Sequence, residues 1–234
     1  MRQIFLDTET TGLSPDAGDR VIEIGCIEMV NRRLTGNNLH FYLNPQRRSH
    51  EDAVKVHGLT DEFLADKPLF DSVADALLTY VKDSHIVIHN ASFDVGFLNA
   101  ELKRLQRGPF ANFVASISDS LTMAREMFPG KSNSLDALCK RLEVDNSNRA
   151  LHGALLDAGL LAEVYVRMTR GQNSLVMNAT EASAADAALQ AVDFCTFDLN
   201  VLAANDVESA AHEAMLLELD KASDGKTIWK ALVA

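Results

Sequence analysis

Cysteine is scarce in this sequence. The 234 residues include three cysteines, Cys26, Cys139 and Cys195, which are far apart and odd in number. This spacing argues against a disulfide framework and against paired-cysteine metal sites. We therefore expect three reduced thiols, most of them buried.

Long hydrophobic runs are missing too. Apolar residues make up 47% of the chain, but no uninterrupted run approaches the roughly 20 residues that a membrane helix requires. The first ten residues, MRQIFLDTET, turn acidic after six residues, which is unlike a secretory signal. We expect a cytoplasmic protein with a full hydrophobic core and no membrane partner.

Positive charge is also in short supply. The 22 Lys and Arg residues stand against 33 Asp and Glu, giving a net charge of −11, whereas tight nucleic-acid binders cluster Lys and Arg. The imbalance is uneven, because residues 171–234 hold 3 basic and 10 acidic residues and residues 1–170 hold 19 and 23. The acidity therefore belongs largely to the C-terminal part.

Hydrophobic patterns predict an α/β fold over the first 171 residues. Strands are predicted at residues 3–6, 21–30, 39–43 and 85–89, and helices at residues 71–81, 93–105, 132–142 and 154–168. Strands that come first and then alternate with helices indicate a mixed sheet flanked by helices.

The composition changes beyond Gly171. Residues 178–191 are rich in small and polar residues, which is typical of a linker. Residues 206–221 then place apolar side chains on one helical face, over a stretch too short for a domain. We divide the chain into a domain at 1–171, a linker at 172–204 and a partner-docking segment at 205–234.

Two carboxylates close the first predicted strand. Asp7 and Glu9 are two residues apart, and the period of a strand places both on the same side, where they can share a cation. On its own, such a pair is usually a solvated strand end.

A third carboxylate, Asp94, follows the strand at 85–89. It falls in the first turn of the next predicted helix, where the helix dipole favours an anion. Active sites of open α/β sheets gather at such strand ends. An ordinary first-turn helix residue would look the same in the sequence.

A histidine and a fourth carboxylate, His152 and Asp157, are five residues apart. On a regular helix their side chains would point roughly 140° apart, so we predict that His152 lies at or before the helix start. Gly153 permits the change of direction. An imidazole there can take a proton from water near neutral pH, as a general base does, although a capping or core histidine is the structural alternative.

The three segments together resemble one family. Residues 7–12 (DTETTG), 89–94 (HNASFD) and 152–157 (HGALLD) are similar to the three motifs of the DnaQ-like (DEDD) 3′–5′ exonucleases of the histidine subclass. The proofreading subunits of bacterial replicative DNA polymerases are the most similar, over residues 1–175 and again at the C-terminus. The resemblance implies a ribonuclease H-like, mixed five-stranded sheet flanked by helices, followed by a flexible C-terminal tail.

The resemblance also implies hydrolysis of phosphodiesters at a DNA 3′ end, with release of 5′-monophosphates. Two divalent cations, Mg²⁺ or Mn²⁺, would be held by four carboxylates, and His152 would be the base. The metal ligands would be Asp7, Glu9, Asp94 and Asp157; the substrate contacts would be Asp7, Glu9, Asp52, His57 and Asp157. The family has Glu where Asp52 stands, and a locally packed loop histidine is an equal alternative for His57.

Two tail segments imply protein partners. Residues 172–177 (QNSLVM) resemble a sliding-clamp-binding peptide with contacts at Gln172, Leu175 and Met177, where Met177 replaces the usual bulkier residue. Residues 205–214 and 228–231, with His212 and Trp229, resemble the tail that grips the polymerase catalytic subunit. Whether a small third core subunit also binds the exonuclease domain is left open. Such tethers raise the effective concentration to roughly the mM range, so an acidic nuclease needs little DNA affinity of its own.

Two other functions are kept as alternatives. A free-standing RNA or oligonucleotide 3′ exonuclease of the same family would lack the tail. A non-catalytic module that stabilises a polymerase would be expected to have lost at least one of the five site residues, and this chain has them all.

Overall fold

The structure is a computed structural model that describes residues 2–147, 151–170 and 204–224. Contacts divide the chain into two units, residues 1–177 and 178–234. In the second unit the described residues form helix α8 (Asp206–Ala222) and its short flanks. The expected linker at 172–204 lies almost entirely outside the described residues. Among those that are described, no helix has the length and apolar character needed to cross a membrane.

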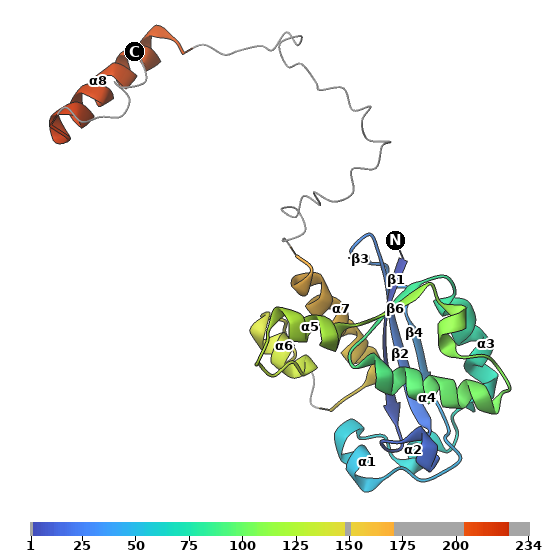
Figure 1. Cartoon of the computed structure of the whole chain (residues 1–234). Coiled ribbons are helices and arrows are strands. Elements are labelled where there is room, and N and C mark those ends of the chain that lie inside the picture. The colour runs from blue at the N-terminus through green and yellow to red at the C-terminus, as the bar shows by residue number, and fades with distance from the viewer. Residues whose placement is uncertain (1, 148–150, 171–203, 225–234) are drawn as a thin grey trace. The chain divides into compact units, whose positions relative to one another are not determined.

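A mixed sheet forms the centre of the first unit (Figure 1). Its strands are β1 (Arg2–Thr10), β2 (Val21–Val30), β3 (Arg33–Leu34), β4 (Leu39–Tyr42), β5 (His85–Ile88) and β6 (Ser116–Asp119). The order is β3-β2-β1-β5-β6, with β4 also paired to β2. Strand β2 pairs antiparallel with β1, β3 and β4. Strand β5 pairs parallel with β1, and β6 pairs parallel with β5.

The sheet has six strands where five were expected. The two-residue strand β3 and strand β4 pair with different parts of β2, whose other edge is occupied by β1. The sheet is therefore five strands wide. Strand β6 offers Ile117 as its single large apolar residue, which explains why its sequence shows no strand pattern.

The described residues of the first unit form seven α-helices: α1 (Glu51–His57), α2 (Asp61–Leu64), α3 (Phe70–Val81), α4 (Ala91–Arg104), α5 (Ser120–Met127), α6 (Leu135–Arg141) and α7 (Ala154–Met168). The helices expected near 71–81, 93–105, 132–142 and 154–168 are present as α3, α4, α6 and α7. The other three span at most eight residues each, too few for a strong helical period.

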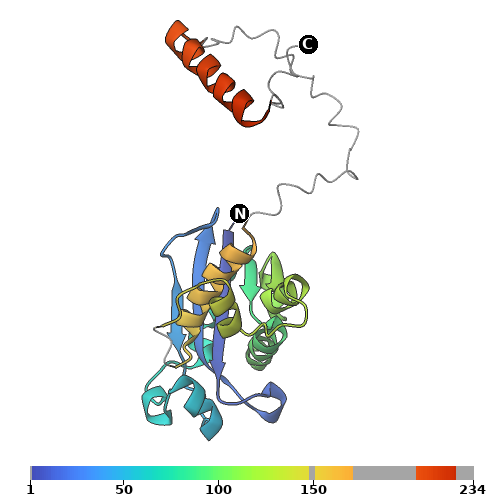
Figure 2. The same ribbon diagram turned by 90° about the vertical axis from the view of Figure 1, so that its left-hand side faces the viewer.

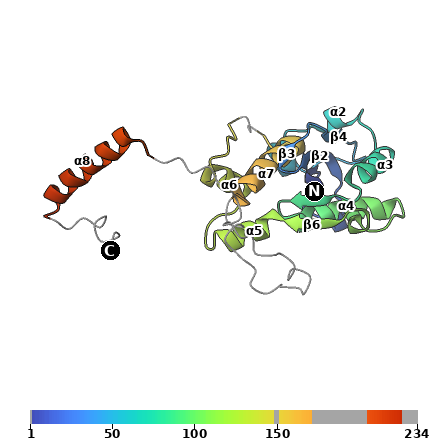
Figure 3. The ribbon, with the colours of Figure 1, turned by 90° about the horizontal axis from the view of Figure 1, so that it is seen from above.

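Alternation along β1 builds two hydrophobic layers, one on each face of the sheet. Figures 1 and 2 show the helices that cover these faces. Ile4 and Leu6 pack with helices α3 and α4, whereas Phe5 packs with α5, α6 and α7. Figure 3 shows the sheet between these helices from above. The same alternation points Thr8 to the α4 side, and Asp7 and Glu9 to the α7 side.

Two cysteines belong to these layers. Cys26 and Cys139 are buried, reduced thiols, as expected, and burial raises the pKa of Cys26 far above its usual range. Cys195 lies outside the described residues.

Strand β2 approaches helix α7 closely at Gly25. This residue lies opposite Asp7 in the β1–β2 pairing. A Cβ atom at Gly25 would lie 2.2 Å from the carbonyl carbon of Ala154 and from the nitrogen of Leu155. Any side chain would push the first turn of α7 away from the sheet, and that turn carries Asp157. Gly25 thus sets how near Asp157 comes to Asp7.

We expect Gly25→Ala to displace α7 and to lower the free energy of unfolding by about 1–3 kcal/mol, because the backbone of Ala154 and Leu155 cannot turn aside. Divalent-cation affinity, measured by calorimetry, should fall with it. Gly159→Ala, in the same helix with open space around its Cβ, is the control and should be neutral or stabilising by about 0.5–1 kcal/mol. Wild-type stability and cation affinity in Gly25→Ala would contradict this role.

Candidate active site

The site lies where β1 continues past the end of β5. The parallel pairing of these strands reaches only Phe5 and Val87, so the edge of β1 beyond that point is open to other groups. The backbone N–H and the hydroxyl of Thr8 donate to Oδ1 of Asp94 over 3.0 and 2.7 Å. Asp94 stands in the first turn of α4, as expected, and Thr8 fixes its position there.

Asp7 and Glu9 face the other side of the sheet, toward α7. They open into a cavity of about 260 Å³, which we name the acidic cavity. It is lined by Asp7, Thr8, Glu9, His89, Asn90, Phe93, Asp94, Ser134, Leu135, Asp136, His152 and Asp157. The structure therefore brings together all five residues that the sequence placed in three separate segments.

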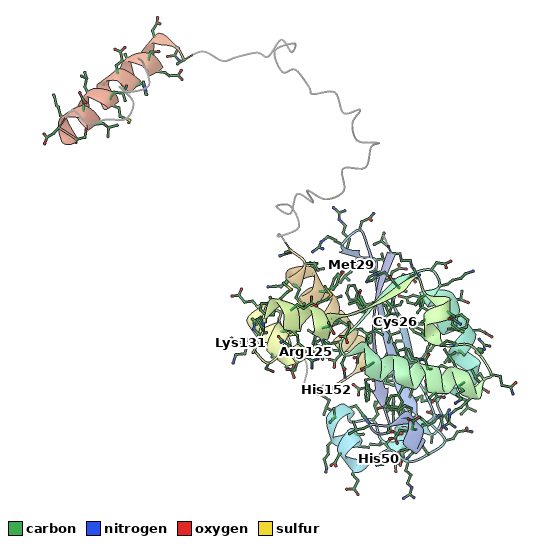
Figure 4. All side chains as sticks on the ribbon, viewed as in Figure 1. Cys26, Met29, His50, Arg125, Lys131 and His152 are labelled. Atoms are coloured by element: carbon green, nitrogen blue, oxygen red, sulfur yellow. The ribbon has the colours of Figure 1, made fainter. Side chains whose placement is uncertain are left out.

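His152 lies just outside α7. The helix begins at Ala154, after the N-cap Gly153, and Asp157 is in its first turn, as the five-residue separation predicted. The ring Nδ1 of His152 lies 3.2 Å from Oδ2 of Asp157, and 43% of the histidine side chain is exposed against 4% for the aspartate. Figure 4 shows His152 at this end of the sheet, near α1.

Glu9, His152 and Asp157 can share one cation, because a ligand atom of each lies within 4.8 Å of those of the other two. Carboxylates are suitable ligands for Mg²⁺ and Mn²⁺, and imidazole is a suitable ligand for ions such as Zn²⁺. The residues present at the site thus fit a divalent metal centre.

Burial makes the charge on Asp94 costly. Burial raises the pKa of this carboxyl to about 7, and the negative charge of Asp119 adds to the rise. The hydrogen bonds from Thr8 act in the opposite direction and lower the pKa. Near neutral pH the Asp94 carboxyl is therefore about half protonated, and positive charge brought into the acidic cavity would favour its ionised form.

Asp119 is a functional residue that sequence analysis missed. Asn90, the N-cap of α4, has a φ of 68°, where residues other than glycine are uncommon. Its N–H donates to Oδ1 of Asp119 at 3.1 Å, and the same oxygen accepts from Leu121 N at 2.8 Å. Asp119 thus holds the turn that presents Asp94. The only sequence signal is a capping residue before a short helix.

The structure keeps the two other expected substrate contacts apart from the acidic cavity. The Asp52 side chain is 93% exposed, pairs with Lys55 at 2.7 Å, and lines a neighbouring cavity of about 500 Å³ with Leu13. His57, the last residue of α1, is buried, and its Nδ1 accepts from Leu59 N at 3.0 Å. Burial, followed by the charge of His152, lowers the pKa of His57.

Four expected partner contacts, Gln172, Leu175, Met177 and Trp229, lie outside the described residues. His212 is described, and it is exposed on α8.

Comparison with known proteins identifies the family. The family profile described as Exonuclease matches residues 4–165. The chain belongs to this exonuclease family. It is 50% identical to DNA polymerase III subunit epsilon of Escherichia coli (strain K12) over 238 residues, which cover 98% of each chain.

Two solved exonuclease structures share the fold. Exonuclease X in complex with 5′-overhanging duplex DNA superposes with a TM-score of 0.56 at 24% identity. The nuclease domain of 3′hExo, a DEDDh family member bound to rAMP, superposes with a TM-score of 0.62 at 16% identity. Each match covers 71% of this chain and 90% of the other. The ribonuclease H-like sheet is thereby confirmed.

Exonucleases of this family depend on divalent metal ions, and the acidic cavity supplies suitable ligands. The carboxylates gathered there would repel one another without such ions. Metal dependence and the charge of the cavity therefore agree.

The raised pKa of Asp94 gives a pH-dependent stability. Its folded value of about 7 lies above the roughly 3.9 of an unfolded aspartate. Between these values the folded state binds more protons, so its stability falls as pH rises. Asp94→Asn keeps an acceptor for Thr8 without the charge. In chelator it should melt at least about 3 °C above the wild type at pH 8, the effect of roughly 1 kcal/mol, and this difference should shrink steadily as the pH falls toward about 4.

Scanning calorimetry of both proteins across this pH range measures the effect. A wild-type melting temperature that tracks that of Asp94→Asn at every pH would contradict the assignment.

Proposed function

We propose that this chain is the 3′–5′ proofreading exonuclease subunit of the replicative DNA polymerase III. It would remove mispaired 3′-terminal nucleotides as 5′-monophosphates, with two divalent cations, Mg²⁺ or Mn²⁺. The observation that carries the proposal is the convergence of Asp7, Glu9, Asp94, His152 and Asp157 on the acidic cavity. The 50% identity to a polymerase III epsilon subunit, which extends over 98% of this chain, supports it.

The four carboxylates are the proposed metal ligands. Asp7 would contact both ions, with Glu9 on one, Asp157 on the other and Asp94 completing the set. Bound there, the ions would supply positive charge to the attacking water and to the leaving 3′ oxygen. Ligand atoms of Glu9 and Asp157 lie within 4.8 Å of each other, which suits two neighbouring ions.

His152 is the proposed general base. A carboxylate can only accept hydrogen bonds, so the contact with Asp157 places the ring proton on Nδ1 and leaves Nε2 to take the proton of the attacking water. The water oxygen then bonds to phosphorus and the P–O3′ bond breaks. The terminal nucleotide leaves as a 5′-monophosphate, and the new 3′ oxygen takes up a proton. We retain Asp52 and His57 as candidate substrate contacts, reached once the nucleotide is bound.

The division of the chain into an exonuclease domain (1–171), a linker (172–204) and a polymerase-binding segment (205–234) is part of the proposal. The polymerase III catalytic alpha subunit would be bound through this segment, with His212 and Trp229 as contacts. Helix α8 supports this, because none of its described residues is buried and Val207, Met215 and Leu217 are exposed. Exposed apolar side chains along one helix are typical of a partner-binding surface.

Two further partners complete the proposal. Gln172, Leu175 and Met177 would bind the sliding clamp, and a small third core subunit is a further candidate partner. With a net charge of −11, the chain would depend on such tethers to deliver it to a DNA 3′ end.

A primer with a mispaired 3′ end tests the proposal. With the polymerase catalytic subunit present, the full chain should release mononucleotides from that end in Mg²⁺ or Mn²⁺. A chain ending at Gly171 should still cleave single strands but should neither bind the polymerase nor be stimulated by it. Asp7→Ala should lose activity at least about a hundredfold, because a metal ligand is removed.

Full activity in Asp7→Ala would contradict the proposed chemistry. Faster turnover of RNA than of DNA, together with no binding to the polymerase, would favour a free-standing RNA or oligonucleotide exonuclease.

A further inference from the structure

The start of helix α1 is hydrogen-bonded to the residue that follows β1. The N–H of His50, the N-cap of α1, donates to the carbonyl of Thr11 at 2.8 Å. The His50 ring lies 3.1 Å from the buried carboxylate of Asp19. Gly12 is enclosed by the same two side chains, since a Cβ there would lie 2.4 Å from Oδ2 of Asp19. The start of α1 therefore follows the strand that carries Asp7 and Glu9.

The end of the same helix contacts the segment that carries His152 through a hydrogen bond and a packing contact. The N–H of His152 donates to the carbonyl of Val56 at 3.1 Å. One residue earlier, Leu151 packs over Gly58, where a Cβ would lie 2.5 Å from the leucine Cδ1. Gly58 ends α1 with a φ of 73° and donates its N–H to the carbonyl of Val54. Helix α1 thus connects the two halves of the site.

This connection matters because the backbone of His152 lies outside α7, although its ring contacts Asp157 in that helix. The residue precedes the N-cap Gly153, so the hydrogen-bond ladder of the helix begins after it. The hydrogen bond from His152 N–H to Val56 and the packing of Leu151 over Gly58 each contribute only about 1 kcal/mol to stability. A displacement of about 1 Å at a catalytic group costs roughly a hundredfold in rate. A small loss of packing at this point would therefore change the rate far more than the stability.

We propose that Gly58 and Leu151 are positioning residues for His152. Glycine at 58 leaves room for Leu151 to lie on the end of α1, and this contact aligns the His152 backbone with β1. The proposal rests on the proposed role of His152 as the base. It assigns no contact with substrate or metal to either residue.

Two variants break the contact in different ways. Leu151→Ala removes the side chain, which is half exposed, at little cost in stability. Gly58→Ala drives Leu151 off α1. Both should lower kcat on a single-stranded oligonucleotide by roughly 10- to 100-fold, with KM and calorimetric affinity for Mn²⁺ within twofold of the wild type. Gly36→Ala is the matched control, because Gly36 has a φ of 79° but open space around its Cβ, and it should keep the wild-type kcat.

A double-mutant cycle with His152→Gln separates positioning from a general loss of structure. If Leu151 acts through His152, adding Leu151→Ala to His152→Gln should lower kcat no further. An unchanged kcat in both Leu151→Ala and Gly58→Ala, or the same fold loss from Leu151→Ala with and without His152, would overturn this inference alone. Wild-type kcat in His152→Gln would instead overturn the base assignment, and this inference with it.

Discussion

Mutual repulsion among carboxylates is the constraint on which the rest of this structure depends. Asp7, Glu9, Asp94 and Asp157 line one cavity, and burial is the main cause that raises the pKa of Asp94 to about 7, with the negative charge of Asp119 adding to it. Specific contacts keep the carboxylates in place despite this repulsion. Thr8 donates a hydrogen bond to Asp94, and Asp119 accepts one from the turn before Asp94. Gly25 leaves room for α7 to approach the sheet. The cavity is therefore arranged for positive charge before any is bound.

The sequence could predict the residues of the site because each stands in a local pattern. The two-residue period of a strand aligns Asp7 with Glu9, and the five-residue gap places His152 ahead of α7. The motifs indicated the family, and the periodic segments predicted the three longest helices of the domain, α3, α4 and α7, together with the shorter α6. What links these patterns is long-range: the contacts of Thr8 with Asp94 and of Gly25 with Ala154 depend on strand register and helix docking, which no local period encodes. Strands β3 and β6 were missed because they are short and polar.

The acidity of the chain has two sources with different consequences. In the domain, carboxylates are the proposed metal ligands, and bound cations would offset them. In the C-terminal part, acidic residues accompany helix α8, whose apolar residues are exposed. In the proposed function, a domain with little attraction for phosphate and a tether that raises its local concentration would suit an enzyme that cuts only at frayed ends. Weak DNA affinity is thus compatible with the proposed activity.

The central claim is that five side chains from three segments form one two-metal site. Anomalous diffraction from crystals grown with Mn²⁺ and a 5′-mononucleotide tests it most directly. We predict two manganese peaks in the acidic cavity, roughly 3.5–4 Å apart, with Asp7 between them, Glu9 at one and Asp157 at the other. A single peak, or peaks only at exposed carboxylates elsewhere, would contradict the account.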